Sequence, residues 1–263
     1  MSKFLFTRRK VLGTFSILSF GSVTKAFATY VPKKISFVLV HGAWHGGWCW
    51  NKLTPMLKSE GHQVFTPTLT GLGERSHLLT TEVDLNTHIQ DIINVLEYED
   101  LNDVILVGHS YAGMVISGVA EKVAQRLSQL IYLDAYLPES GKSINDYNNA
   151  KAAASPEVEK TNRLPIWGSP QIYGVTNKED VTWMADRLGE QPYKTFTQSL
   201  QIKEDPGQHI RKTFIQLSEY PQFIEAAERA KGKGYGYYKL LSGGHDAMVS
   251  KPIELNNILL KLV

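Results

Sequence analysis

The sequence predicts an α/β protein in which a mostly parallel sheet is flanked by helices. Short apolar runs alternate with segments that carry apolar residues at helical spacing. Parallel strands need long crossover connections, and helices of this length supply them. The chain has 263 residues, of which 43% are hydrophobic and 21% charged. These values fit one large globular domain with a sizeable core.

Four strands and three helices are expected to alternate in the first half of the chain. The strand segments are apolar and rich in branched residues, as in strands buried in a parallel sheet. Gly61 suits the end of the first helix, and Asp84 suits the N-cap of the second. In chain order, the expected elements are a strand at 35–40, a helix at 48–58, a strand at 62–68, a helix at 84–98, a strand at 103–107, a helix at 111–124 and a strand at 129–133.

The alternation breaks between residues 138 and 208, where the sequence becomes polar and contains prolines. Helix-like pieces at 144–153 and 178–188 indicate an inserted helical cap. The pattern then resumes, with a strand at 212–217, a helix at 221–230, a strand at 235–241 and a helix at 252–262.

Residues 1–28 have the organisation of an export signal. A basic region ends at Lys10, an apolar stretch follows over 11–23, and Ala26-Phe27-Ala28 suits cleavage after Ala28. Arg8-Arg9 resembles the bacterial twin-arginine signal, and an ordinary Sec signal is the alternative. The apolar stretch is short for a hydrocarbon core of about 30 Å, so we expect no stable membrane anchor after signal removal. A periplasmic or secreted protein is expected.

Charge and cysteine content exclude several classes of function. Cys49 is the single cysteine, which excludes an internal disulfide framework and a multi-cysteine metal site. The formal charge is +2, but residues 1–28 hold five basic residues and no acidic one; without them, 23 basic and 26 acidic residues give −3. With no run of Lys and Arg, we expect no nucleic-acid partner.

A candidate nucleophile stands between the strand at 103–107 and the helix that follows it. The segment Gly108-His-Ser-Tyr-Ala-Gly113 has the strand, sharp turn and helix context of a nucleophile elbow, with Ser110 at its apex. Small residues are required on both sides because the backbone turns tightly. Ala112 stands where the strict pattern has a second glycine. The alternative is a serine that only caps the helix.

Attack on an ester carbonyl creates an oxyanion, which needs hydrogen-bond donors already in place. The backbone N–H of Tyr111, directly after the nucleophile, is one expected donor, and that of Ala43 is the other. Gly42 lets this second loop approach closely, and its neighbours His41 and Trp44 are expected to contact substrate. His41 and His45 stand four residues apart, but the intervening and following glycines argue against a helix, so no metal is expected.

The general base is expected to be His245, in a glycine-containing turn after the strand at 235–241. His109 and His209 are interpreted as structural. The acid that orients His245 has two candidates: Asp134, directly after the strand at 129–133, and Glu219, after the strand at 212–217. We favour Asp134, because a carboxylate at the C-terminal end of a parallel strand points into the crevice where such sheets bind ligands.

Together these motifs resemble the α/β-hydrolase superfamily, in particular bacterial esterases related to plant methylesterases and hydroxynitrile lyases. The resemblance covers residues 35–263. It is carried by Val38-Leu-Val-His-Gly-Ala-Trp-His-Gly-Gly-Trp-Cys-Trp50, Thr66-Pro-Thr-Leu-Thr-Gly-Leu-Gly-Glu-Arg-Ser-His77, the elbow and Gly244-His245. It implies an α/β-hydrolase fold, with Ser110 and His245 as catalytic residues and the N–H groups of Ala43 and Tyr111 as the oxyanion hole. The hydrolase domain is expected to cover residues 29–263, directly after the export signal.

Two departures from the family pattern narrow the expected chemistry. The plant relatives carry an aspartate in the loop after the strand at 212–217, where this chain has Ser218-Glu219-Tyr220-Pro221, and this supports Asp134 as the acid. The lyases use a threonine in the first strand and a lysine after the histidine, where this chain has Val38 and Asp246. Cyanohydrin cleavage is therefore not expected.

The expected function is hydrolysis of a small carboxylic ester through a Ser-His-Asp triad and an acyl-enzyme, without a cofactor. An apolar substrate pocket beneath the cap is expected to use tryptophans, with Trp44, Trp48, Trp167 and Trp183 as candidates. A lactonase, amidase or perhydrolase on the same site is the first alternative. A ligand-binding homologue without catalytic activity is the second.

Overall fold

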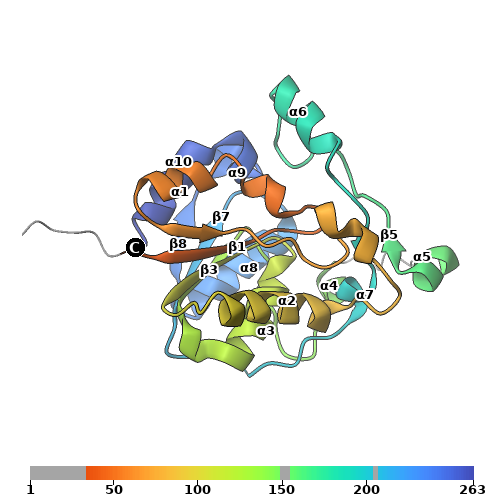
Figure 1. Cartoon of the computed structure of the whole chain (residues 1–263), viewed down its shortest axis with the longest axis horizontal. Coiled ribbons are helices and arrows are strands. Elements are labelled where there is room, and N and C mark those ends of the chain that lie inside the picture. Colours follow the sequence, from red (N-terminus) through yellow and green to blue (C-terminus); the bar gives the residue numbers. More distant parts are fainter. Residues whose placement is uncertain (1–33, 149–154, 204–206) are drawn as a thin grey trace, which may run out of the picture. The chain divides into compact units, whose positions relative to one another are not determined.

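The computed structural model describes residues 34–148, 155–203 and 207–263, and the expected export segment lies outside them (Figure 1). Its main feature is a six-stranded sheet of order β2-β1-β3-β4-β7-β8. All five pairs of neighbouring strands are parallel. The strands are β1 (Ser36–Val40), β2 (Gln63–Phe65), β3 (Val104–His109), β4 (Leu127–Leu133), β7 (Arg211–Gln216) and β8 (Gly236–Lys239).

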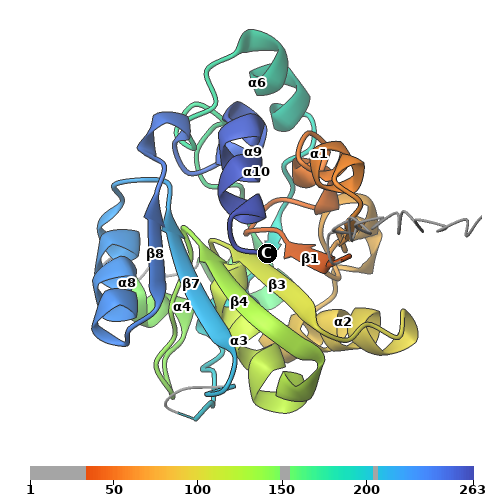
Figure 2. The same cartoon turned by 90° about the vertical axis from the view of Figure 1, so that its left-hand side faces the viewer.

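Helices cover both faces of this sheet, as the expected crossovers require (Figure 2). The longer ones are α1 (Thr54–Ser59), α2 (Leu85–Tyr98), α3 (Ala112–Val123), α8 (Pro221–Gly232) and α10 (Pro252–Leu260). The four-residue helix α9 (Ala247–Ser250) follows the loop that carries His245. Asp84 caps α2 as expected, since its carboxylate accepts a hydrogen bond from the Thr87 N–H at 2.9 Å.

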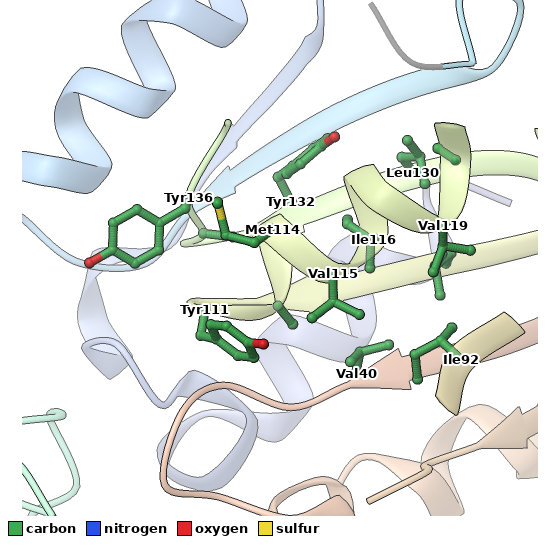
Figure 3. Close-up of a cluster of buried hydrophobic side chains, with 14 of the residues drawn as sticks. Val40, Ile92, Tyr111, Met114, Val115, Ile116, Val119, Leu130, Tyr132 and Tyr136 are labelled. Carbon is green, nitrogen blue, oxygen red and sulfur yellow. The ribbon is translucent and has the colours of Figure 1, made fainter. Parts of the chain in front are cut away.

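The two faces of the sheet have separate cores, because successive side chains of a strand point to opposite sides. In β1, Val38 and Val40 contribute to the core under α2, α3 and α8, whereas Phe37 and Leu39 contribute to the core under α1, α9 and α10. Figure 3 shows side chains of α3 packed on β1 and β4 in the first core. Burial on both faces explains why the strands are nearly continuous apolar runs.

Most elements start and end within a few residues of the expected positions, and the differences have physical causes. The helix expected at 48–58 is a 3₁₀ turn at Gly47–Trp50 followed by α1. Pro55 occupies the first turn of α1, and a helix running through it would clash with the carbonyl four residues earlier. The edge strand β2 stops at Phe65, shortly before Pro67, which has no N–H to donate.

The segment at 138–208 contains short elements between β4 and β7. The helix expected at 144–153 is α4 at its start, and residues 149–154 lie outside the described part of the chain. The helix expected at 178–188 is α6, which is shorter. The segment comprises α4 (Ile144–Tyr147), α5 (Pro156–Thr161), β5 (Arg163–Leu164), α6 (Lys178–Ala185), β6 (Gln191–Pro192) and α7 (Lys194–Thr197).

None of the helices in the described ranges combines the length and hydrophobicity that crossing a bilayer requires.

Two glycines allow the sharp turn from β3 into α3. A Cβ on Gly108 would lie 2.8 Å from the Ala112 carbonyl oxygen, and a Cβ on Gly113 would lie 1.9 Å from the Tyr136 carbonyl oxygen. Both obstacles are backbone atoms, which cannot move aside as a flexible side chain can. Gly113 therefore lets the start of α3 pack directly against the loop after β4.

We predict that Gly113→Ala lowers the free energy of unfolding by at least about 2 kcal/mol, because the added methyl group overlaps backbone. Gly232→Ala is the matched control, since Gly232 also lies in a helix but a Cβ there meets nothing within 4 Å. Its stability should stay within about 0.5 kcal/mol of the parent or increase, because alanine favours helix. Urea unfolding measures both values, and equal stability of the two variants would contradict the prediction.

Candidate active site

The candidate site lies where β1, β3 and β4 end, the edge of a parallel sheet at which ligands bind. Three non-glycine residues there have positive φ: Trp44 at 64°, Ser110 at 55° and Asp134 at 44°. Each follows a different strand of the sheet. Such backbone costs of order 1–3 kcal/mol per residue and persists only where the surroundings fix it.

Hydrogen bonds from neighbouring strands fix the Ser110 turn. The Ser110 N–H donates to the Leu133 carbonyl at 3.2 Å, and the Ser110 carbonyl accepts from the N–H groups of Gly113 and Tyr136, both at 3.1 Å. The end of β4, the loop that follows it and the start of α3 therefore hold both the N–H and the carbonyl group of Ser110. This is the strained strand-to-helix turn that presents a nucleophile at the edge of such a sheet.

Asp134 and His245 are brought together, although they are 111 residues apart in the sequence. His245 Nδ1 lies 2.6 Å from Asp134 Oδ2, and both side chains are buried. Nδ1 must carry the proton in this bond, because a carboxylate only accepts. His245 is thereby held in the tautomer that leaves Nε2 available as a base.

The Asp134 carboxylate has further donors on the loop after β7. It accepts from the N–H of Leu217 at 2.9 Å, from the N–H of Ser218 at 3.1 Å and from the Ser218 hydroxyl. Glu219, the alternative acid, is exposed on the same loop. This loop thus contributes donors to Asp134, and the structure pairs His245 with Asp134.

The imidazole of His245 is held on several sides. Phe223 of α8 stacks on it with a centroid separation of 4.9 Å and an interplanar angle of 10°. Tyr220 meets it edge to face. His109 Nε2 donates to the His245 carbonyl at 3.0 Å, and burial lowers the pKa of His109 well below its ordinary value, so this ring is neutral. His109 also lines the cavity that Ser110 and His245 line.

Ser110 and His245 line one cavity of about 600 Å³. No hydrogen bond joins the Ser110 hydroxyl to His245 in the structure as described. Catalytic hydrogen bonds often form only when substrate is bound, so the absence of this bond does not argue against a catalytic pair.

The two expected oxyanion donors, Ala43 and Tyr111, also line the cavity. Neither backbone N–H donates a hydrogen bond to any residue in the described ranges. A Cβ on Gly42 would lie 2.9 Å from the Cβ of Ser110, so the loop after β1 passes directly against the serine. Both N–H groups are thus near Ser110 and available to a ligand.

His41 does not fit the prediction that it contacts substrate. It is fully buried and lies outside the cavity lining. Its Nδ1 donates to the Gly42 carbonyl at 2.8 Å, and its Nε2 accepts from the Leu69 N–H at 3.1 Å. Burial lowers its pKa to about 3, so the ring is neutral and joins two backbone segments.

Two of the four candidate tryptophans line the cavity. Trp44 and Trp167 do so, whereas Trp48 and Trp183 lie outside the lining and pack edge to face at 5.2 Å. Most of the wall was not predicted from the sequence, because its residues come from the loop after β4, the irregular segment at 138–208 and the start of α8, where no motif marks them. The missed aromatic residues are Tyr136, Tyr147, Tyr173, Tyr193, Phe196, Tyr220 and Phe223.

One group in the described part of the chain has three side chains that could hold a metal ion: His109, His245 and Asp246, with ligand atoms within 4.8 Å of one another. Each is otherwise engaged. His109 donates to a carbonyl, His245 donates to Asp134, and Asp246 accepts from His45 at 3.0 Å. The ring nitrogen of His245 that Asp134 leaves available is Nε2, so a metal bound there would occupy the proposed base.

Buried neutral histidines predict a loss of stability in mild acid. His88 donates from Nε2 to the Thr70 carbonyl and accepts at Nδ1 from the Tyr111 hydroxyl, and burial lowers its pKa to about 4. Burial lowers the pKa values of His41 and His109 as well. Below pH about 6.5 the unfolded chain binds protons that the folded chain does not. The free energy of unfolding therefore decreases as the pH is lowered, by about 1.4 kcal/mol per pH unit for each such histidine.

Urea unfolding between pH 7.5 and 4.5 measures this slope. In His88→Gln the change of the unfolding free energy with pH should be smaller by about 1.4 kcal/mol per pH unit, the contribution of one such histidine. His77→Gln, at an exposed position, should leave it unchanged. A slope that does not differ between the two variants would contradict the assignment of His88 as a neutral group.

Comparison with known proteins adds independent information. A model of the alpha/beta hydrolase family matches residues 37–258. The carbendazim hydrolyzing esterase of Nocardioides sp. (strain SG-4G) is 56% identical over 109 residues, which are 41% of this chain and 45% of that protein. The match thus spans less than half of that relative. Salicylic acid-binding protein 2 of Nicotiana tabacum is 26% identical over 253 residues, with 86% of this chain and 96% of that protein covered.

Solved structures resemble the fold over most of the chain. The methylesterase MES16 from Arabidopsis has a TM-score of 0.70 at 26% identity, covering 87% of this chain and 98% of that one. An extracellular alpha/beta-hydrolase from a Paenibacillus species has a TM-score of 0.75 at 21% identity, covering 86% and 98%.

Proposed function

Because the chain belongs to the alpha/beta hydrolase family, we propose that it is an esterase that hydrolyses carboxylic esters through Ser110, His245 and Asp134. One observation carries the proposal. The buried 2.6 Å contact between Asp134 and His245 orients an imidazole into the cavity that Ser110 also lines.

In the acylation step, His245 Nε2 accepts the Ser110 proton while Oγ attacks the acyl carbon. The oxyanion that forms accepts hydrogen bonds from the N–H groups of Ala43 and Tyr111. The imidazolium then donates its proton to the leaving alkoxide. Asp134 stays ionised and stabilises the charge on the ring.

In the deacylation step, His245 accepts a proton from water, which attacks the acyl-enzyme and releases the acid. Ser110 regains its proton from the imidazolium, and the cycle returns every group to its starting state. Both steps use residues of this chain and water only.

The lining of the cavity supports a small ester with a flat apolar portion. Trp44, Trp167 and Phe196 form an aromatic wall, and Trp44 lies 5.6 Å from Phe196 between ring centroids. Carbendazim is a suitable probe beside p-nitrophenyl esters, because the Nocardioides relative is named for hydrolysing it. Its methyl carbamate is attached to a flat benzimidazole ring.

Ser110→Ala should abolish the burst of p-nitrophenol release from p-nitrophenyl acetate and lower kcat by up to about 10⁶-fold, because the attacking oxygen is removed. Stopped-flow absorbance measures the burst, and circular dichroism checks that the fold persists. Assays of lactone hydrolysis, amide hydrolysis and peracid formation separate the alternative hydrolase chemistries. A folded parent protein with no burst on any short ester would favour a ligand-binding homologue instead.

Asp134→Asn should lower kcat by about 10²-fold to 10⁴-fold, because an amide no longer stabilises the imidazolium or selects the tautomer. Glu219→Gln is the matched control on the loop after β7, and it should keep the parent kcat. Steady-state kinetics with one ester compares the two. A large loss in Glu219→Gln with full activity in Asp134→Asn would reverse the choice of acid.

A further inference from the structure

A second histidine and carboxylate pair lies beside the proposed triad. His45 Nε2 is 3.0 Å from Asp246 Oδ2, and the two side chains are 2% and 0% exposed. His45 belongs to the loop after β1 that carries Ala43, and Asp246 directly follows His245. The pair therefore joins the loop of the proposed oxyanion hole to the loop of the proposed base.

His45 carries a proton on both ring nitrogens. Nε2 faces a carboxylate, and Nδ1 lies 2.6 Å from the Ala43 carbonyl oxygen, so both neighbours are acceptors. Burial alone would lower the pKa of His45, but the charge and hydrogen bond of Asp246 outweigh it and raise that pKa. Burial would raise the pKa of Asp246, and His45 lowers it in turn. The pair is an imidazolium and a carboxylate.

The peptide between Ala43 and Trp44 is held at both ends. His45 binds its carbonyl oxygen, and Gln191 Oε1 accepts from its N–H at 3.0 Å. The next carbonyl, that of Trp44, accepts from the Gly189 N–H at 3.0 Å. Fixing this peptide fixes ψ of Ala43 and so restricts the preceding peptide, which supplies the Ala43 N–H. The positive φ of Trp44 shows that the loop does not adopt an ordinary relaxed turn.

The Asp246 end of the pair is equally constrained. Its N–H donates to the Tyr173 carbonyl at 2.9 Å, and its carbonyl accepts from the N–H groups of Val249 at 2.9 Å and Ser250 at 3.1 Å. His109 Nε2 lies 3.6 Å from its other carboxylate oxygen. His45 is thus hydrogen-bonded to a residue whose backbone is fixed in the loop that carries His245.

Stability alone does not explain such a pair. Taking two charges out of water carries a penalty that their attraction often fails to recover, and apolar side chains of similar volume stabilise at least as well. A directional contact to one carbonyl oxygen is something that apolar side chains cannot provide. The pair therefore fits a geometric role in the site.

We propose that His45 and Asp246 are positioning residues that hold the Ala43 peptide so that its N–H points at the oxyanion. The inference rests on the proposed esterase function. It predicts that loss of the pair weakens binding of the tetrahedral intermediate and leaves binding of the ester itself nearly unchanged.

The test uses the full-length protein with His45→Gln, Asp246→Asn and the double variant. Each single variant should lower kcat by about 10²-fold, since a displacement near 1 Å at a reacting group has an effect of that size. KM for p-nitrophenyl acetate should stay within about twofold of the parent, as expected when an interaction made only in the transition state is lost. The double variant should be no worse than the worse single variant, because the two residues act as one unit.

A trifluoromethyl ketone supplies a readout that a purely structural role would not move. It forms a tetrahedral adduct on a serine nucleophile, and its Ki should rise in parallel with the loss in kcat. Leu255→Ala, in the buried face of α10, is the control for general destabilisation and should leave kcat and Ki unchanged for folded protein.

The outcomes separate this inference from the esterase proposal. A Ser110-dependent burst in the parent together with parental kcat and Ki in folded His45 and Asp246 variants would overturn the positioning role alone. A fall in kcat without a change in Ki would also overturn it. If His45→Gln does not fold, Asp246→Asn decides, since it keeps the shape of the side chain; if neither folds, the pair serves stability and the inference is wrong. Absence of any burst in the parent would overturn both proposals.

Discussion

The candidate site depends on the hydrogen bonding of one buried carboxylate, that of Asp134. Asp134 directly follows β4. Its carboxylate accepts hydrogen bonds from two N–H groups and one hydroxyl of the loop after β7, and from Nδ1 of His245 in the loop after β8. Three neighbouring strand ends are therefore joined at one side chain. Charge-assisted bonds of this kind are about twice as strong as neutral ones, so the same contact that orients the imidazole also fixes the loops around it.

Strain and rigidity are found at the same positions. Trp44, Ser110 and Asp134 have left-handed backbone, and the proposed chemistry uses the side chain of two of them and a backbone N–H next to the third. Hydrogen bonds to the backbone of adjacent strands stabilise this strained conformation; one is the 2.7 Å bond from the Asp134 N–H to the Ile215 carbonyl. Side chains held in this way need little reorganisation when charge develops, which is the main source of electrostatic catalysis.

Sequence reasoning predicted the sheet and the centre of the site because both leave local signals. Buried parallel strands are apolar runs, and Gly108 and Gly113 mark the turn at Ser110 because only glycine leaves room beside the backbone oxygens there. His41 was misjudged: its position in the motif suggests substrate contact, but its ring nitrogens are occupied by backbone. The cavity wall and the partners of Asp134 had no local signal, since they depend on how distant loops such as that of Ser218 meet in three dimensions.

The buried histidines around the site differ in charge, and the hydrogen-bond partners of each ring determine whether it is neutral or protonated. His41 and His88 each have one acceptor and one donor as partners, an arrangement that only a neutral ring satisfies. His45 faces two acceptors, a carbonyl and a carboxylate, which only an imidazolium satisfies. Asp246 is hydrogen-bonded to His45, whereas the adjacent His245 is hydrogen-bonded to Asp134. The two carboxylates next to His245 therefore have separate hydrogen-bond partners, one that holds the proposed base and one that holds the loop of Ala43.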